Sequence, residues 1–563
     1  MHHARLDPVN VRMIRGQVLH GVRQTGQSTT TELPSIRPMP PMEALVRSTQ
    51  FQYHQALVRP VWLILGLSVA AASLLSTLAQ AQVPARDQAE NRDGFYWLNE
   101  QNKASLLMLT EEGIITRELA ANIAGSLTQV IADGDKPGAA RSRDYLVVEA
   151  DMIDIGGPEV SRLHSGRSRQ DLGQTSTRLF LRDAFLESYA QFIDARVALL
   201  AMAEQHPHAI LPFYTHGVQA QPTSLGHYLG GYLQAMTRSS DRYQQAWARL
   251  NLSPLGGAAG GTSSFPVDRA RLAELLGFDD VLVNSFDAGQ IANQDNGVEL
   301  ATVAASAALT VSMFAADLTV QYADPHPWFQ LTEGAQTGIS SIMPQKRNPI
   351  GLERLHLTTS TVTGAAVTYL IQSNNVMSGM GDYKGDQPLQ VVRQLGSMYA
   401  DFSNMLEALV FDPERALAEV NNDYSMTTEL ADILQRDSEV PFRVGHHFAS
   451  DIVSYGRERN LKPAEIPYEV AQMLFTESWK AYGRAEERLP LTEPQFRLAL
   501  TGENMIDSAR PVGGPQKEEV LRMLAAEKAR IQADLEWLAA TSRKLNDATQ
   551  MRAAGVAALL GYR

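Results

Sequence analysis

The segment Leu300–Val320 carries almost no charge over about twenty residues, and it restricts the possible folds more than any other part of this chain. A run of this length is long enough to cross a membrane. Its many alanine, serine and threonine residues instead favour a helix buried within a large bundle of a soluble protein. After residue 90, apolar residues recur at three- and four-residue spacing, and alternating β-branched runs are scarce. The sequence therefore predicts an all-α fold.

Length, charge and cysteine content exclude several classes of protein. The chain has 563 residues, which predicts roughly two to four domains. Its formal charge of −13 makes it a poor candidate for nucleic-acid binding, because phosphates require a basic surface. It has no cysteine, which excludes disulfides, cysteine metal sites and thiol catalysis.

The N-terminal region has the features of a secretory leader. Val61–Leu78 has no charged residue, two arginines precede it, and Ala81 ends an A-x-A spacing. These features predict a signal peptide that is cleaved after Ala81, with translation starting at or near Met42. We therefore expect an exported, periplasmic protein that begins near Gln82 and has no stable membrane anchor. A cytoplasmic location and a membrane anchor are the alternatives, since the apolar run is close to the lower limit for a spanning helix.

Polar residues gather in four segments that lie between the expected helices. The arginines of the first segment offer planar forks to carboxylates, which indicates an anion site, although a solvated turn that caps the next helix has the same composition. In the second segment, Thr215 and His216 stand just before an expected helix start. A lone histidine is most often structural, but histidine is also the commonest general acid or base. The four segments are His164–Asp171, Tyr214–Tyr232, Asn284–Asn296 and Thr337–Glu353.

Taken together and in this order, the segments resemble motifs of the argininosuccinate lyase branch of the aspartase/fumarase superfamily, over about residues 95 to 525. "HSGRSRQD" is similar to that branch's H-T-G-R-S-R-N-D, and "THGVQAQP" to T-H-x-Q-x-A-Q-P. "SPLGGAAGGTSSFPVDR", "NSFDA" and "VPFRVGHH" also have counterparts. "SSIMPQKRNP" matches the superfamily signature S-S-x-M-P-x-K-x-N-P, which is the most specific of these patterns.

The resemblance implies an anti β-elimination that releases an amine from an N-substituted succinate and leaves fumarate. It implies that Ser340 is the base, acting as an oxyanion on a mobile loop with Lys346 beside it. By the same resemblance His216 supplies or relays a proton to the leaving amine, and Glu353 orients His216. No metal or cofactor is implied. The implied substrate-binding residues are Ser168, Arg169, Gln170, Thr215, Asn284, Gln345, Asn348 and Tyr383.

Three departures from the family pattern bear on the substrate. Gln170 replaces an asparagine, a glycine usually next to the catalytic serine is displaced to Gly338, and the segment Tyr383–Gln390 matches only loosely. Argininosuccinate is therefore the first expectation, within arginine biosynthesis. Another aminodicarboxylate such as ethylenediaminedisuccinate is the alternative, and it suits an exported enzyme better. A non-catalytic protein of the same fold, as occurs in eye lens, and an exported binding protein remain as further alternatives.

The resemblance also implies an architecture. It predicts a leader (1–81), a helical N-terminal domain (82–166), a central helical-bundle domain (167–422) and a helical C-terminal domain (423–563). Four central domains would form a twenty-helix bundle in a homotetramer with D2 symmetry, and each active site would take residues from three subunits. The expected partner is a small-molecule N-substituted aspartate.

Overall fold

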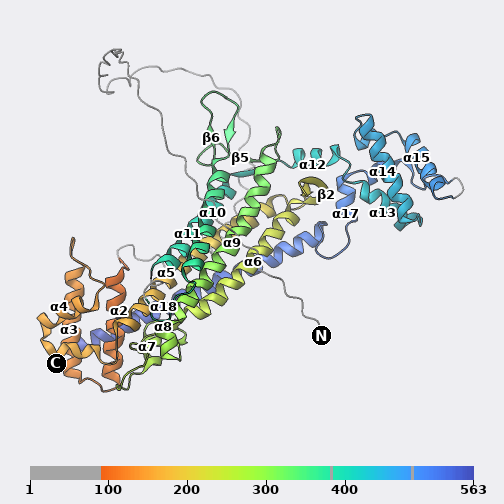
Figure 1. The fold of residues 1–563 in the computed structure, drawn as a ribbon. Coiled ribbons are helices and arrows are strands. Elements are labelled where there is room, and N and C mark those ends of the chain that lie inside the picture. Colours follow the sequence, from red (N-terminus) through yellow and green to blue (C-terminus); the bar gives the residue numbers. More distant parts are fainter. Residues whose placement is uncertain (1–90, 381–384, 484–486, 563) are drawn as a thin grey trace, which may run out of the picture. The chain divides into compact units, whose positions relative to one another are not determined.

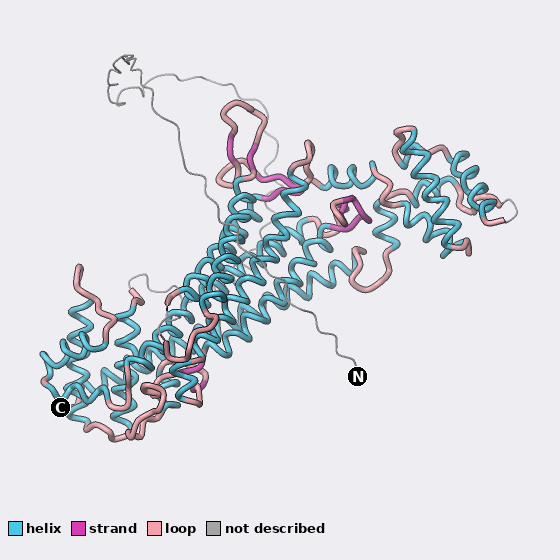
Figure 2. Tube along the Cα trace, in the orientation of Figure 1, coloured by secondary structure: helices cyan, strands magenta, loops and turns pink. Residues whose placement is uncertain are grey.

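The computed structural model of this chain describes residues 91–380, 385–483 and 487–562. The predicted leader and Tyr383 lie outside these residues. Helices account for most of the described chain, which confirms the predicted all-α class (Figures 1 and 2). The strands are short and form pairs rather than larger sheets.

The largest core lies among long helices that pack along their lengths (Figure 1). Helix α11 packs against α5, α10 packs against α9 and α11, and α6 packs against α5 and α9. Aromatic side chains fill the centre, with Tyr243 between Phe192 and Phe185. The bounds are α5 Arg169–Gln205, α6 Leu225–Leu250, α9 Ala292–Tyr322, α10 Ile350–Gln372 and α11 Gln387–Ala408.

Helix α9 contains the weakly charged segment that was singled out in the sequence. Within the described residues it is the one helix whose length and composition would suit a membrane span. Its residues at three- and four-residue spacing, including Ala304, Val311 and Phe314, are buried in the largest core. The opposite side of the helix exposes Leu309 and Met313, with 58% and 63% of their surface accessible. A single chain therefore buries only one side of this apolar helix.

A second core lies in the N-terminal part of the chain. Each of its first three helices begins at a side chain that accepts a backbone N–H, the preferred arrangement for a helix start: Asp93, Thr116 and Asp144. Helix α7 and Leu255 join this core from much later in the sequence. The bounds are α2 Gly94–Glu111, α3 Arg117–Gly134, α4 Tyr145–Gly156, the 3₁₀ helix η2 Pro158–His164, and α7 Arg269–Leu275.

Short helices after residue 412 form a third core around Phe448, Phe475 and Phe496. A small fourth cluster joins Val420 and Ile506 to the start of β1. The bounds are α12 Pro413–Asn422, α13 Thr427–Ser438, α14 Phe442–Glu458, η3 Pro463–Glu465, α15 Tyr468–Ala481, α16 Glu493–Ala499 and α17 Gly502–Ser508.

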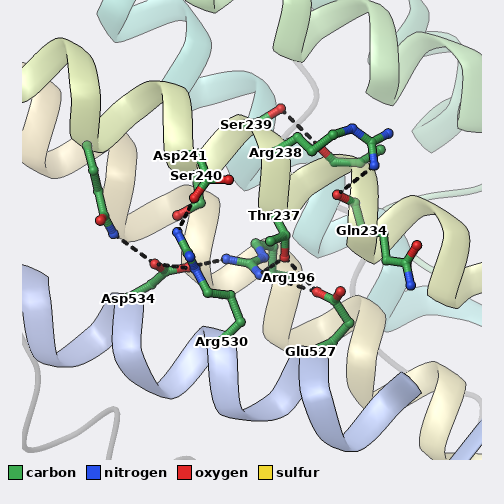
Figure 3. A network of polar contacts seen from close by, with 12 residues as sticks. Arg196, Gln234, Thr237, Arg238, Ser239, Ser240, Asp241, Glu527, Arg530 and Asp534 are labelled. Carbon is green, nitrogen blue, oxygen red and sulfur yellow. Dashed lines mark hydrogen bonds and ion pairs between the residues drawn. The ribbon is translucent and has the colours of Figure 1, made fainter. Parts of the chain in front are cut away.

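The last helix, α18 (Lys517–Leu560), returns to the long helices and packs against α5 and α6. A buried polar network holds it there (Figure 3). Arg196 of α5 is fully buried, forms an ion pair with the buried Asp534, and donates a hydrogen bond of 2.6 Å to Thr237 of α6. Thr237 in turn donates to Glu527 at 2.6 Å. The predicted domain boundaries stay predictions, and the packing adds that residues after 516 share the cores of the earlier helices.

The strands serve as short ties between helices. The longest pair, β1 with β2, is an antiparallel hairpin between α5 and α6. Pair β6–β7 closes the loop that carries the superfamily signature. The bounds are β1 Ile210–Thr215, β2 Val218–Ser224, β3 Leu252–Ser253, β4 Asp280–Val281, β5 Phe329–Leu331, β6 Gly338–Ile339, β7 Arg347–Asn348 and β8 Leu409–Phe411.

Candidate active site

The first group of predicted site residues lies at the N-terminus of α5. Ser168 is the N-cap residue, and its hydroxyl oxygen accepts the backbone N–H of Gln170 at 3.2 Å. The exposed side chain of Arg169 points its charge toward solvent and lies 4.0 Å from Asp144. A helix N-terminus carries partial positive charge, so a cap hydroxyl and an exposed guanidinium there suit a carboxylate ligand. Ser168 and Arg169, which are adjacent in the sequence, both lie at this helix start, and their role in substrate binding stays a prediction.

Gln170 contacts protein groups instead of standing free for a substrate. Its amide nitrogen donates to the backbone oxygen of Gly289 and lies 3.3 Å from the side-chain oxygen of Gln290. Both partners are at the end of α8 (Ser285–Gln290). Asn284 is the N-cap of that same short helix, where its side-chain oxygen accepts the N–H groups of Phe286 and Asp287. Asn284 is exposed and belongs to the same part of the molecule as Ser168.

Two buried charged residues flank Ser168 and Arg169. The sequence placed Arg167 among the arginines of an expected anion site, and it assigned no role to Asp171. Arg167 donates hydrogen bonds to Asn102 and Ser105 of α2, and burial lowers its pKa. Asp171 is completely buried, and burial raises its pKa to about 6, even though its carboxylate accepts several backbone N–H groups. Both residues were visible in the quoted motif. In the sequence, one charged residue stands on each side of Ser168–Gln170, and this pattern was the signal for their importance.

The second group lies in the loop between β6 and β7. The hydroxyl oxygen of Ser340 accepts the backbone N–H of Met343 at 3.1 Å, with the N–H of Ile342 at 3.5 Å. Pairing of Gly338 with Asn348 closes the base of the loop. Donors that point at a hydroxyl oxygen stabilise its deprotonated form, which is the form that a serine base requires.

Four further predicted residues belong to this second group. Gln345 and Lys346 are exposed in the same loop, and Asn348 lies in β7. Glu353 is exposed in the first turn of α10, immediately after the loop. The loop thus presents an amide, an ammonium and a hydroxyl on one short segment, with a carboxylate close behind it.

The third group, Thr215 and His216, is at the tip of the β1–β2 hairpin. His216 and Gly217 both have positive φ, 55° and 73°, as a two-residue type I′ turn requires. Thr215 pairs with Val218 across the turn. The prediction that these residues stand just before a helix is wrong, because the chain first returns as β2 and the helix begins at Leu225. The turn leaves the imidazole of His216 exposed.

The three groups are not joined within one chain. Helix α5 has 37 residues and is therefore roughly 55 Å long. Ser168 precedes its start, whereas His216 follows its end by eleven residues, which span at most about 40 Å. In residues 91–380, 385–483 and 487–562, no hydrogen bond or ion pair connects Ser168, His216 and Ser340. Nor do these residues include a group of three or more metal-ligating side chains.

Comparison with known proteins places these features in a family. Residues 100–364 match the family described as "Lyase", and residues 424–507 match "Argininosuccinate lyase C-terminal". The chain is 30% identical to the argininosuccinate lyase of Methanosarcina mazei over 442 residues, which cover 77% of this chain and 87% of that protein.

Solved structures agree with the sequence comparison. EDDS lyase in complex with formate is 28% identical and superposes with a TM-score of 0.75, covering 84% of this chain and 93% of that one. A variant of EDDS lyase with bound fumarate has the same identity and TM-score, with 88% and 99% coverage. The chain therefore belongs to the argininosuccinate lyase family within the fumarase superfamily, and it is a carbon–nitrogen lyase.

Proposed function

We propose that this enzyme cleaves a carbon–nitrogen bond of an N-substituted L-aspartate, with argininosuccinate as the first candidate, and releases fumarate by anti β-elimination. The observation that carries the proposal is the hydrogen bond from the Met343 N–H to the Ser340 hydroxyl oxygen. An ordinary serine hydroxyl does not lose its proton readily, and only the deprotonated form can act as a base. An N–H donor directed at the oxygen stabilises that deprotonated form.

The reaction is a proton abstraction followed by loss of the amine. The Ser340 alkoxide takes a proton from the carbon next to a carboxylate, and the electron pair moves onto that carboxylate. Lys346 and Asn348, in the same loop, stabilise the added negative charge. When the charge returns, the carbon–nitrogen bond breaks, fumarate forms, and His216 donates a proton to the departing nitrogen. Ser168 and Arg169 hold the other carboxylate at the start of α5.

We further propose that the active site is completed by association of four copies. The length of α5 separates Ser168 from His216 in one chain, whereas a small substrate needs both. The exposed apolar side chains of α9 and α10, including Leu309, Met313 and Leu357, supply a face on which copies would pack. Antiparallel packing of long helices from different copies would bring opposite helix ends together.

The test is fumarate formation by purified protein. Argininosuccinate and ethylenediaminedisuccinate are supplied separately, and fumarate is followed by its ultraviolet absorbance. Ser340→Ala serves as the negative control, with Ser341→Ala as a matched hydroxyl deletion next to it. Fumarate from argininosuccinate that depends on Ser340 supports the proposal. No fumarate from either compound would overturn both candidate substrates.

Ethylenediaminedisuccinate is the second candidate substrate. The resemblance to EDDS lyase structures supports it, as does Gln170, whose amide is held by the Gly289 oxygen where the family pattern has the shorter asparagine. A higher kcat/KM for ethylenediaminedisuccinate than for argininosuccinate would assign the enzyme to it.

We also propose that the mature enzyme is exported and begins near Gln82. The support is the sequence of the leader alone, with its apolar run and the A-x-A spacing that ends at Ala81. N-terminal sequencing of the protein from fractionated native cells tests this. An intact leader in the cytosolic fraction would overturn it and would favour a role in arginine biosynthesis.

A further inference from the structure

The carboxylate of Asp171 joins two segments that lie 85 residues apart in the sequence. One oxygen accepts the backbone N–H groups of Ser168 at 2.9 Å and Leu172 at 3.0 Å. The other accepts those of Gly256 at 2.9 Å and Ala258 at 3.0 Å. The first pair belongs to the start of α5, and the second pair to the glycine-rich loop 253–265. Each oxygen therefore accepts two hydrogen bonds, and both bonds come from the same segment.

The glycine-rich loop continues the connection to α8. The hydroxyl of Ser285, the first residue of α8, donates to the backbone oxygen of Gly260 at 2.9 Å. The amide of Gln290, the last residue of α8, donates to the backbone oxygen of Ala259 at 3.1 Å. The backbone of the loop also lies against α8 closely enough that a Cβ atom on Gly257 would lie 3.6 Å from Ser285. The loop therefore holds both ends of the short helix that Asn284 caps.

We propose that Asp171 is a positioning residue that sets the distance between the carboxylate-binding start of α5, with Ser168 and Arg169, and the substrate-binding Asn284. The connection runs from Asp171 through Gly256 and Ala258 to the glycine-rich loop, and from this loop through Ser285 to Asn284. Asp171 touches no substrate in this arrangement, because its side chain is completely buried. This proposal rests on the proposed function, because it requires that Ser168, Arg169 and Asn284 bind the substrate.

A carboxylate is needed at this position for a reason of hydrogen-bond chemistry. Four N–H donors converge on two oxygens, and only an ionised carboxylate accepts at both. An asparagine has the same shape but presents an NH₂ group on one side, so two backbone donors would face another donor. Two buried N–H groups without acceptors are costly, and the two segments would move apart. The side chain at residue 171 would keep its size and shape.

Other contacts between α5 and α8 do not replace this connection. Gln174 donates to the backbone oxygen of Gly289 at 3.0 Å, and Gln170 donates to the same oxygen. These bonds fix the C-terminal end of α8. Asn284 is at the other end of the helix, where the hydroxyl of Ser285 donates to Gly260 and the guanidinium of Arg269 donates to the backbone oxygens of Leu282 and Val283. A loosened glycine-rich loop should therefore displace Asn284 more than Gly289.

The experiment compares Asp171→Asn with Asp194→Asn, the same substitution at an exposed position of the same helix. For Asp171→Asn we expect KM to rise by about tenfold or more with kcat within about threefold, because carboxylate binding is lost while the base and proton donor are untouched. Asp194→Asn should leave both constants unchanged. Ser285→Ala, which removes a later link of the same connection, should raise KM by a few-fold.

Backbone hydrogen exchange supplies a readout that does not depend on turnover. Residues 164–170 and 254–262 should exchange faster together in Asp171→Asn, and only there. An unchanged KM in folded Asp171→Asn would overturn the proposal. If that variant does not fold, an unchanged KM in Ser285→Ala would overturn it equally. If the wild type releases no fumarate, the proposed function fails. The connection is refuted separately if Asp171→Asn loses exchange protection in only one of the two segments.

Discussion

The hydroxyl oxygen of Ser340 lies 3.1 Å from the backbone nitrogen of Met343, which donates a hydrogen bond to it. The three-residue separation makes this a local feature of the loop, whose base is closed by the pairing of β6 with β7. A hydroxyl that already accepts a backbone N–H is prepared to carry negative charge, because the donor needs no rearrangement when the proton leaves.

Removal of the Ser340 hydroxyl should abolish the chemistry and spare the fold. Ser340→Ala is expected to lower kcat by at least about 10³-fold, since only transition-state stabilisation is lost. The far-ultraviolet circular dichroism should not change, because the loop is exposed. Ser341→Ala is the matched control and should keep most of the activity. Activity retained in Ser340→Ala and lost in Ser341→Ala would move the base to Ser341.

Substitution of His216 should impair turnover more than substitution of Glu353. We expect His216→Asn to lose the proton donor, whereas Glu353→Gln loses only the group that orients and polarises it. Steady-state kcat of the two variants measures the order. An inactive Glu353→Gln beside an active His216→Asn would reverse the two roles.

Mixing two inactive variants tests whether a site takes residues from different copies. Ser340→Ala and His216→Asn subunits are dissociated together in denaturant and allowed to reassemble. If each site takes Ser340 and His216 from different copies, about a quarter of the sites in random equal mixtures have both residues intact. The measurement is the recovered rate of fumarate release. A mixture that stays inactive, while each variant alone reassembles, would place both residues in one copy.

The features that the sequence predicted correctly are local ones. The apolar spacing in segments such as Leu300–Val320 predicts long helices, and the helix-capping turn that was the alternative to an anion site around Ser168 is present. The placing of His216 failed because the choice between a helix start and a hairpin depends on whether residues 218–224 find a partner strand. Contacts between distant segments, such as Asp171 with Gly256, leave no periodic pattern in a single sequence. The return of α18 to the bundle is a contact of the same kind.

The buried carboxyl group of Asp171 should give the unfolding free energy a defined pH dependence. Burial raises its pKa to about 6, above the ordinary value of 3.8. The folded state then binds more protons than the unfolded state between these values, so this group makes stability fall as pH rises from about 4 to about 6. Titration of Asp171 lowers the free energy of unfolding by about 3 kcal/mol over this range. Above about pH 6 this group causes no further decrease.

Urea unfolding at pH 4, 5, 6 and 7 of the wild type and Asp171→Asn isolates this contribution. The other carboxyl groups titrate in both proteins, so the difference between the two curves reports residue 171. We expect the wild type to lose more stability than the variant between pH 4 and 6. Parallel curves would show that the pKa of Asp171 is not raised in the folded protein.

Breaking the buried ion pair that holds α18 should destabilise the fold strongly. Arg196 and Asp534 are both buried, with 0% and 1% of their surface exposed (Figure 3). Asp534→Ala leaves the Arg196 guanidinium in the core with Thr237 and Glu527 as its polar partners among the described residues. We expect a loss of about 3 kcal/mol in the free energy of unfolding, at the lower end for buried pairs because Glu527 lies 3.6 Å away.

Two further variants separate the cost of an unpaired charge from the value of the pair. Arg196→Met combined with Asp534→Leu removes both charges, and it should recover much of the loss because apolar groups of similar volume need no partner. Lys136→Ala breaks an exposed pair with Asp133 and should leave stability nearly unchanged, because water screens that pair. Urea unfolding measures all three. If the double variant is as unstable as Asp534→Ala, the stranded guanidinium is not the source of the cost, which then arises from packing or from the lost contacts of Asp534 with Gln244 and Arg530.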